Sequence, residues 1–383
     1  MDSAEMIGVA SLIRKMPEGY EKACYETGAI VRKRDIKDPN DLMMLALFHL
    51  LNGCSLIEIS EISKLSKLGN ISDVAFMKRF SNCNEWFKWI SSSICNDKPS
   101  IIKYSVPECL SKYRILAVDA SDVIEKGATG KTYRLHFALD IIKMQAAIYK
   151  ITDNSVGEHL HNFDFSPDDL VIADRAYSTL TSMEHCNSIG CKYITRMRSN
   201  SFKISDSEGN IIDFIGYMQT HSSGELKAYA KSCGKHGEIK MMPVRICFER
   251  KTDEAIEETQ RKIKRRASKK QLATTLPETY SFNEYIVLIT SLEDSIPYDV
   301  ILALYRYRWQ VELYFKRLKS ILGYGDMPKK SRNSIFSWLN GKLMIALLIE
   351  SIVGSGDFSP CDYIEEEYME GDEILCIGSD NQY

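Results

Sequence analysis

The stretch LYRYRWQVELYFKRLKSIL, residues 304–322, decides how this chain is interpreted. It contains neither Gly nor Pro and is followed by a glycine, so it is predicted to form one helix of several turns. At about 100° per residue, Tyr305, Arg308, Glu312 and Lys319 fall on one narrow face, and apolar side chains cover the other. One acid among two cations and a phenol suits a carboxylate held beside phosphates. Ordinary helical ion pairs are the alternative explanation of such a face.

Two other acids end short apolar runs earlier in the chain. Asp119 follows ILAV, and Asp174 follows LVIA. A buried strand that ends on an acid delivers a carboxylate to the edge of a sheet. A turn or a helix cap is the ordinary alternative for either acid alone. Taken together with Glu312, the two acids predict a site built from three carboxylates.

The spacing Tyr-x2-Arg-x3-Glu-x6-Lys within residues 305–319 resembles the signature of cut-and-paste insertion-sequence transposases, the YREK group of the DDE family. The motifs around the other two acids are similar to those of the same family, with Ala120 after the first Asp and DRAY at residues 174–177. The family usually has Gly where this chain has Ala176, which is a mild departure. The resemblance spans about residues 40–350.

This resemblance implies a mixed α+β fold of the α/β class, with an RNase H-like catalytic core, an N-terminal helical domain and a β-rich insertion before the last acidic helix. It implies that Asp119, Asp174 and Glu312 are catalytic and hold two Mg²⁺ or Mn²⁺ ions, with Asp119 bridging both. Oxygen ligands suit these ions better than zinc. The implied reaction is metal-dependent cleavage of DNA at the ends of an insertion sequence, followed by strand transfer to target DNA. Relatives with this helix signature pass through a hairpin at the transposon end.

Other residues are assigned to DNA contacts. Those expected to hold phosphates on the face of the acidic helix are Tyr305, Arg308 and Lys319. Arg196 and Arg198 alternate at the end of a predicted strand, in the segment that meets transposon-end DNA in the family. Tyr285 is the nearest candidate for an aromatic ring that stacks on a flipped-out base. A tyrosine that opens a strand more often belongs to the core, which is the alternative for Tyr285.

A basic run, RKIKRRASKK at residues 261–270, carries seven cations in ten residues. It follows several glutamates and is predicted to be the C-terminal half of one helix. The helix dipole accounts for some cations at a helix end, and a solvated face is the alternative. Seven cations exceed what capping needs, so we predict phosphate contacts from Arg261, Lys262, Lys264, Arg265 and Arg266.

Residues 1–105 are predicted to form an N-terminal helical DNA-binding domain. Ser55 and Glu58 form a capping box at the start of one helix, and Ser72 caps the next. A helix, a glycine-containing turn and a second helix with Lys78 and Arg79 are compatible with a helix-turn-helix. An ordinary small helical domain is the alternative, and the resemblance favours DNA binding.

Strand patterns begin near residue 113, and the predicted order of domains follows from them. Strands are predicted at 114–119, 132–140, 143–151, 170–174 and 193–197, with a helix at 178–188. Within the long connection to the acidic helix, residues 225–230, 241–250 and 284–290 alternate like strands. The predicted boundaries are core 106–200, insertion 201–280, core 281–355 and acidic tail 356–383.

Composition sets wider limits. The chain has 383 residues, of which 44% are hydrophobic and 26% charged, as in soluble globular proteins. We expect no transmembrane segment or signal peptide, and eleven cysteines without metal-ligand spacing indicate a reducing, cytoplasmic setting. The net charge of −3 includes nine acids and no Lys or Arg in residues 357–383, which leaves +6 for the rest. The body is therefore mildly basic. Bulk charge does not itself indicate nucleic-acid binding, so local basic patches must do so.

The predicted function is that of a prokaryotic transposase, associated with the nucleoid. Its partners are double-stranded DNA at the terminal inverted repeats and at the target, and we expect a homodimer on DNA. His136 and His159 are assigned to core packing. Three alternatives remain: a nuclease of the same fold that does not rejoin DNA, a transposase-derived DNA-binding regulator without catalysis, and an unrelated soluble α/β protein.

Overall fold

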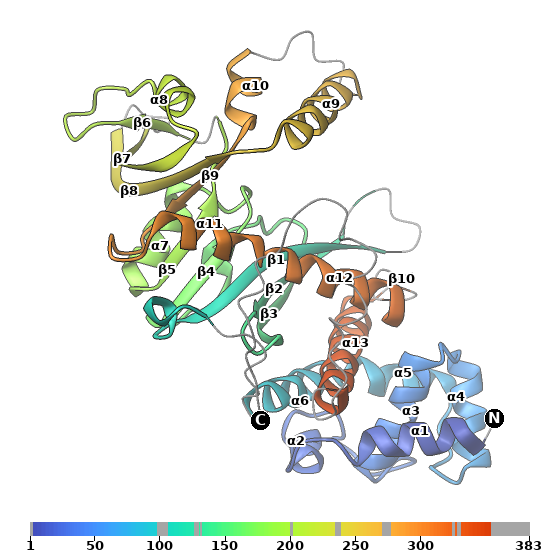
Figure 1. The fold of residues 1–383 in the computed structure, drawn as a ribbon. Coiled ribbons are helices and arrows are strands. Elements are labelled where there is room, and N and C mark those ends of the chain that lie inside the picture. The colour runs from blue at the N-terminus through green and yellow to red at the C-terminus, as the bar shows by residue number, and fades with distance from the viewer. Residues whose placement is uncertain are drawn as a thin grey trace, which may run out of the picture. The chain divides into compact units, whose positions relative to one another are not determined.

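The computed structural model divides into two compact units, residues 1–98 with 340–383 and residues 99–339 (Figure 1). The described residues are 3–97, 106–125, 130, 132–199, 202–233, 239–269, 277–323, 326–327 and 331–353. The acidic tail, for which we predicted a separate segment from residue 356, lies outside them. The division differs from the predicted boundaries, because residues from 340 onward join the N-terminal unit and not the core.

The N-terminal unit is helical, as predicted. Asp38, Ser55 and Ser72 each cap a helix through a side-chain oxygen that accepts a backbone N–H, and Ser55 and Glu58 form the predicted capping box. Its helices are α1 (Ser3–Ile13), α2 (Tyr20–Glu26), α3 (Pro39–Leu51), α4 (Leu56–Leu65), α5 (Asp73–Ser81) and α6 (Asn84–Asp97).

The turn between α4 and α5 requires glycine. Gly69 has φ +145°, and a Cβ at this position would lie 2.4 Å from the carbonyl oxygen of Asp35. Ser63 and Ser60 fix the same turn by donating hydrogen bonds to the carbonyls of Gly69 and Ile71. The turn between the two helices is therefore held by specific backbone contacts, and its role in a DNA-binding helix-turn-helix stays a prediction.

The second unit is built on one long sheet with the strand order β3-β2-β1-β4-β5-β9-β8-β7-β6, and β10 pairs with the far end of β1. β1 is antiparallel to β2 and parallel to β4, and β4 is parallel to β5. The predicted strands are present, and β1 runs six residues further than predicted. The strands are β1 (Arg114–Glu125), β2 (Tyr133–Asp140), β3 (Gln145–Asp153), β4 (Asp169–Ala173), β5 (Lys192–Arg196), β6 (Lys203–Ser205), β7 (Ser223–Cys233), β8 (Ile239–Arg250), β9 (Tyr285–Thr290) and β10 (Asp326–Met327).

A salt bridge holds the start of the parallel pair β1 and β4 in register. Arg114 and Asp169 are register partners, and the Arg114 guanidinium donates two hydrogen bonds to the Asp169 carboxylate at 2.6 and 2.8 Å. The Asp169 side chain is 1% exposed and also accepts the backbone N–H of Ser166. A bidentate pair with a buried carboxylate is specific in geometry, so it fixes which residues of the two strands lie side by side.

Helices cover both faces of the sheet. Helix α7 (Leu180–Ile189) contributes Met183 and Cys186 to the core formed with Val118 and Val171. On the other face lie α11 (Tyr298–Arg306), which contacts β8, and α12 (Trp309–Leu322), which contacts β1 and β2 (Figure 1). The two faces follow from the alternation of side chains along each strand.

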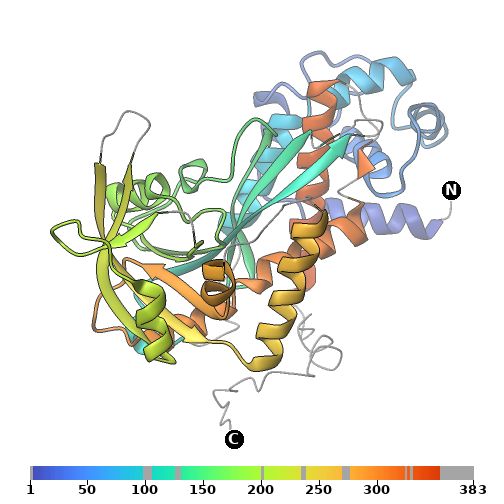
Figure 2. The same cartoon turned by 90° about the horizontal axis from the view of Figure 1, so that it is seen from above.

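The predicted β-rich insertion is not a separate sheet. Its strands extend the core sheet, because β8 pairs with β9 from Arg245–Thr290 to Arg250–Tyr285 and satisfies the backbone groups that β9 would otherwise expose (Figure 2). The described part of the insertion also contains helices α8 (Phe214–Thr220) and α9 (Asp253–Lys269) and the start of α10 (Pro277–Asn283).

The prediction of one helix over residues 304–322 is wrong in one respect. The helix is interrupted between α11 and α12, where Arg308 N–H bonds the carbonyl of Tyr305 and Val311 N–H bonds that of Arg308. These bonds span three residues, as in a 3₁₀ turn, and no Gly or Pro marks the site. The tighter turn places Arg308 at the start of α12, so Tyr305 and Glu312 belong to different helices.

The division between the two compact units falls within the residues of helix α13 (Arg332–Val353). Within the part of the chain that the structure describes, α13 is the one helix long and apolar enough to cross a membrane, although 72% of its most apolar window is buried. Burial of this extent is the pattern of a core helix.

The Arg114–Asp169 pair generates a stability prediction. Asp169→Ala should lower the free energy of unfolding by about 3 kcal/mol, because it leaves the Arg114 guanidinium without its buried partner. Thermal and urea unfolding measure the effect. Asp294→Ala is the matched control, because Asp294 forms an exposed ion pair with Lys227 and should change stability by less than about 1 kcal/mol. Equal stability of both variants would show that the pair does not hold the strands.

Candidate active site

The register of β1 and β4 brings two predicted acids together. Val118 pairs with Ala173, so Asp119 and Asp174 are the next residues on neighbouring parallel strands. Neighbouring strands lie about 4.8 Å apart, and residues at matching positions of a parallel pair point to the same face. Asp119 and Asp174 therefore present their carboxylates side by side at the C-terminal end of β4.

The third acid, Glu312, comes from the first turn of α12. The helix is fixed over β2 by Tyr314, whose ring stacks on Phe137 with centroids 4.5 Å apart. Phe137 is the register partner of Asp119 on β2. Since Tyr314 lies two residues after Glu312, this stack ties α12 to the strand beside Asp119.

The charges confirm that the three acids are electrostatic neighbours. The pKa of Asp119 is raised to about 6: burial is the largest cause, the negative charges of Glu312 and Asp174 add to the rise, and the N–H of Ala120 and the charge of Arg308 oppose it. The three carboxylates do not form a compact metal-binding group in this structure, because among the described residues no three His, Cys, Asp or Glu side chains lie close enough to hold an ion. All three donors are carboxylate oxygens, the chemistry that Mg²⁺ prefers.

Arg308 holds Glu312 in place. Its guanidinium donates a 2.6 Å hydrogen bond to the Glu312 carboxylate, so the helical ion pair considered from the sequence is present. The same guanidinium lies over the ring of Tyr305, 5.9 Å from its centroid. Burial raises the pKa of Tyr305 to about 12. Lys319, in the last turn of α12, is exposed.

Two arginines lie near Asp174. Arg196, the last residue of β5, is half-buried, and burial lowers its pKa although Tyr305 and Asp174 partly offset the effect. Arg175 follows Asp174 directly and is exposed. Arg198 is also exposed, two residues beyond the end of β5. These positions are compatible with the predicted contacts of Arg196 and Arg198 with DNA, which remain predictions.

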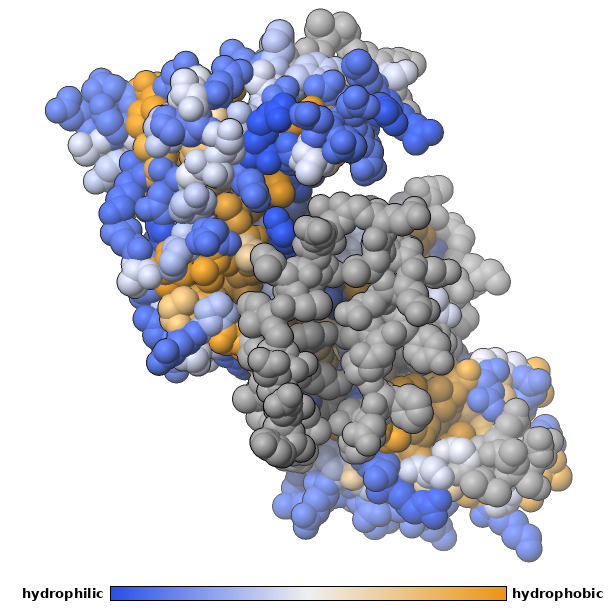
Figure 3. Space-filling view, viewed as in Figure 1, coloured by the Kyte–Doolittle hydropathy of each residue, from blue (hydrophilic) through white to orange (hydrophobic). Residues whose placement is uncertain are grey.

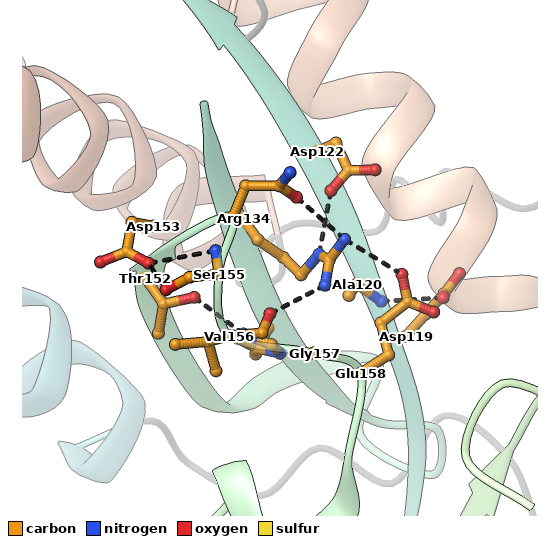
Figure 4. A network of polar contacts seen from close by, with 12 residues as sticks. Asp119, Ala120, Asp122, Arg134, Thr152, Asp153, Ser155, Val156, Gly157 and Glu158 are labelled. Carbon is orange, nitrogen blue, oxygen red and sulfur yellow. Dashed lines mark hydrogen bonds and ion pairs between the residues drawn. The ribbon is translucent and has the colours of Figure 1, made fainter. Parts of the chain in front are cut away.

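A polar network supports β1 from its other face (Figure 4). Arg134 of β2 pairs with its register partner Asp122 at 2.9 Å and donates to the carbonyl of Val156 at 2.8 Å. The same guanidinium lies 3.7 Å from the Glu158 carboxylate. The network ties the segment after β3 to β1 near Asp119.

The predicted basic helix is present as α9, and its surface is hydrophilic (Figure 3). Arg261 and Lys262 form exposed ion pairs with Glu257 and Glu258, each four residues earlier. Lys264 and Arg265 are exposed and have no carboxylate within ion-pair distance among the described residues. The side chain of Arg266 lies outside the described residues.

The stacking role considered for Tyr285 is contradicted by its burial. Tyr285 is 5% exposed, and its ring contacts Phe248 in the core. Tyr285 is the first residue of β9 and pairs with Arg250 of β8. Its side chain belongs to the hydrophobic core of the second unit. Core packing was the alternative explanation for this residue. His136 is also buried, with a pKa lowered by burial to about 4, as predicted for a core histidine.

Sequence reasoning missed three residues near the site. Arg175 and Tyr177 belong to the DRAY motif but were given no role, and the buried hydroxyl of Tyr177 has no hydrogen-bond partner among the described residues. Burial raises the pKa of Tyr177, and the charge of Asp119 raises it further. Lys251 lies in the loop after β8, where no local pattern could have indicated a role.

Two strand-end carboxylates and a helix-borne glutamate on a sheet of order β3-β2-β1-β4-β5 define an RNase H-like nucleic-acid enzyme. Residues 110–348 match the family model described as a transposase DDE domain. The chain is 28% identical over 361 residues to the InsL protein of insertion sequence element IS186A from Escherichia coli K12, covering 90% of this chain and 93% of that protein. It is equally similar, over 362 residues, to the transposase of element IS421 from Escherichia coli.

A more distant relative is the transposase of element IS231E from Bacillus thuringiensis subsp. finitimus, 24% identical over 200 residues, or 48% of this chain and 41% of that protein. The chain belongs to the DDE-domain transposases. It is an enzyme of DNA transposition, which cleaves DNA and transfers strands.

The raised pKa of Asp119 predicts that its ionised carboxylate lowers the stability of the fold. A carboxyl whose pKa is higher in the folded state destabilises the fold when it is ionised, so the penalty is complete above about pH 6 and absent near pH 4. Asp119→Asn should therefore raise the melting temperature at pH 8 in a metal-free buffer. The corresponding increase in the free energy of unfolding is at most roughly 3 kcal/mol. The difference should vanish near pH 4. Asp122→Asn should instead destabilise, because Asp122 pairs with Arg134.

Proposed function

We propose that this chain is a transposase of the YREK group that acts at the terminal inverted repeats of an insertion sequence, with Asp119, Asp174 and Glu312 as its catalytic residues. The proposal rests on two observations: the register of β1 and β4, which aligns Asp119 with Asp174, and the negative charges of Glu312 and Asp174, which act on Asp119. The relatives named for IS186A and IS421 support a role at an insertion sequence, because they match over nine-tenths of the chain.

The three carboxylates would hold two Mg²⁺ or Mn²⁺ ions, the pair that phosphoryl transfer uses, and the donor set supports these ions over zinc. When bound, such ions neutralise the phosphate and lower the pKa of attacking water. The negative charges of Glu312 and Asp174 contribute to the raised pKa of Asp119, although burial is the main cause and Arg308 opposes the rise. The mutual repulsion of these acids supports the assignment. Binding of cations would relieve that repulsion.

The protein's own contribution is to hold the DNA strand against the acids. Arg308 has five N–H donors, so it can keep its bond to Glu312 while it donates to a phosphate. Tyr305 lies under the Arg308 guanidinium and restricts its orientation. Lys319, two turns along α12 from Glu312, would contact a neighbouring phosphate. The freed 3′-hydroxyl would then attack the target phosphodiester in the same site.

The N-terminal unit would bind the end of the element, with α5 as the second helix of a helix-turn-helix. Lys78 is exposed on α5, which supports a contact with DNA, whereas Arg79 donates to the carbonyl of Arg32. Assembly as a homodimer on DNA, in the prokaryotic cytoplasm and at the nucleoid, completes the proposal. A regulator without catalysis is less well supported, because it would not need three converging acids.

Glu312→Gln tests the proposal, because it keeps the size of the side chain and removes a metal ligand. It should abolish Mg²⁺-dependent nicking of a DNA fragment that carries the element's end, while DNA binding persists or strengthens. Arg308→Ala and Lys319→Ala should weaken binding and leave a residual rate of nicking. The measurements are a gel assay of nicking and strand transfer and a thermal unfolding curve for each variant.

Two outcomes would contradict this assignment. Nicking by Glu312→Gln at the wild-type rate would remove Glu312 from the site. A wild type that binds the element's end but neither nicks nor joins DNA would favour the regulator, and one that nicks without strand transfer would favour a nuclease.

The basic face of α9 generates a separate prediction. Lys264→Gln with Arg265→Gln should reduce the dependence of log Kd on log salt by about two, because each phosphate contact contributes about 0.9 to the slope. Arg261 and Lys262 already pair with glutamates, so their double replacement should have a smaller effect. An unchanged slope in both double variants would show that α9 is a solvated surface helix that does not contact DNA phosphates.

A further inference from the structure

A second group of cations lies on the sheet face that carries α11. Arg196 of β5 pairs with Leu288 of β9, which pairs with Cys247 of β8. Side chains two residues apart along a strand share a face, so the face of Cys247 is also that of Glu249 and, as the chain leaves β8, of Lys251. Arg306 of α11 reaches Glu249 at 3.6 Å, which shows that α11 covers this face.

Lys251 is fixed in the loop between β8 and α9. Its backbone N–H bonds the carbonyl of Glu284, and its ammonium donates to the carbonyl of Asn283 at 2.6 Å and to the hydroxyl of Thr259 at 3.3 Å. The side chain is half-buried. Both partners are neutral, so the charge of Lys251 is oriented but not neutralised by them.

The group holds more positive charge than the protein compensates. The pKa of Lys251 is lowered to about 8, mainly by burial and in addition by the positive charges of Arg196, Arg175 and Lys262. In the described parts of the chain, no carboxylate lies within ion-pair distance of Lys251, Arg196 or Arg175. Asp174 is the nearby acid that acts on Arg196, and it belongs to the three-acid site.

We infer that Lys251, Arg196 and Arg175 form a phosphate-binding subsite beside the three acids, which takes a backbone phosphate of the DNA strand entering the site. The inference rests on the proposed function. Arginine forks match phosphate oxygens in geometry, and a lysine adds a compact charge. Arg196 and Lys251 are half-buried and Arg175 is exposed. Binding of such an anion would stabilise these cations, because no carboxylate of the described residues pairs with them.

The subsite would link the basic helix to the active site. The positive charges of Lys262 on α9 and of Arg196 and Arg175 all act on the ammonium of Lys251. Arg175 in turn directly follows Asp174 in the sequence. A strand that follows these cations passes from the insertion to the acids. The insertion would then position the strand for cleavage, in addition to any contacts along α9.

The test measures binding of a fluorescein-labelled DNA duplex at several salt concentrations. Lys251→Gln should weaken binding and lower the salt slope by about one, the value for one lost phosphate contact. Lys251→Arg should keep the wild-type slope, because the charge remains. Lys240→Gln is the matched control, since Lys240 is an exposed lysine of β8 that pairs with Glu184, and it should leave the slope unchanged.

Arg175→Gln guards against loss of folding in Lys251→Gln, because Arg175 is exposed and its replacement should not lower the melting temperature. It too should lower the slope by about one. A wild-type slope in both Lys251→Gln and Arg175→Gln would overturn the subsite. A loss of slope in Lys251→Arg equal to that in Lys251→Gln would also overturn it, because a structural role would then explain the effect.

The outcome is independent of the catalytic assignment. If wild type binds the duplex with the predicted slopes but does not nick DNA, the subsite stands and the proposed function fails. If nicking depends on Glu312 while the slopes of all Lys251 and Arg175 variants equal that of wild type, the proposed function stands and the subsite fails.

Discussion

The register between β1 and β4 is the constraint on which the site depends. A shift of one residue between parallel strands would turn a carboxylate to the other face of the sheet, and Asp119 would no longer lie beside Asp174. The bidentate bond between Arg114 and the buried carboxylate of Asp169 fixes this register at the start of both strands. Five residues later the same alignment places the two acids together, and the stack of Tyr314 on Phe137 brings Glu312 to them.

The second constraint is electrostatic. Burial is the main reason that the pKa of Asp119 rises, and repulsion by the negative charges of Glu312 and Asp174 adds to the rise. Arg308 offsets part of the repulsion through its bond with Glu312. Bound metal ions would offset the rest. The repulsion among the carboxylates in the free protein would therefore favour metal binding. The cations around Lys251 are the counterpart for the negatively charged DNA.

Much of this could be predicted from the sequence, because the signals were local. Short apolar runs ending in Asp119 and Asp174 indicated strand ends, and Ser55 with Glu58 indicated a helix start. The break between α11 and α12 could not be predicted, because helical dihedral angles continue through Arg308. Only the hydrogen-bond pattern changes there, from bonds that span four residues to bonds that span three. The pairing of β8 with β9 and the placement of Lys251 depend on contacts between segments distant in sequence. Tyr285 was misjudged because local sequence does not report burial.

The most direct test of the central claim is the affinity of the protein for Mn²⁺, measured by electron paramagnetic resonance in the presence of DNA. Asp119→Asn, Asp174→Asn and Glu312→Gln should each weaken Mn²⁺ binding by at least about tenfold, which corresponds to about 1.4 kcal/mol. Asp122→Asn, on the same strand as Asp119 but paired with Arg134, should bind Mn²⁺ like wild type. Wild-type affinity in all three acid variants would contradict the account.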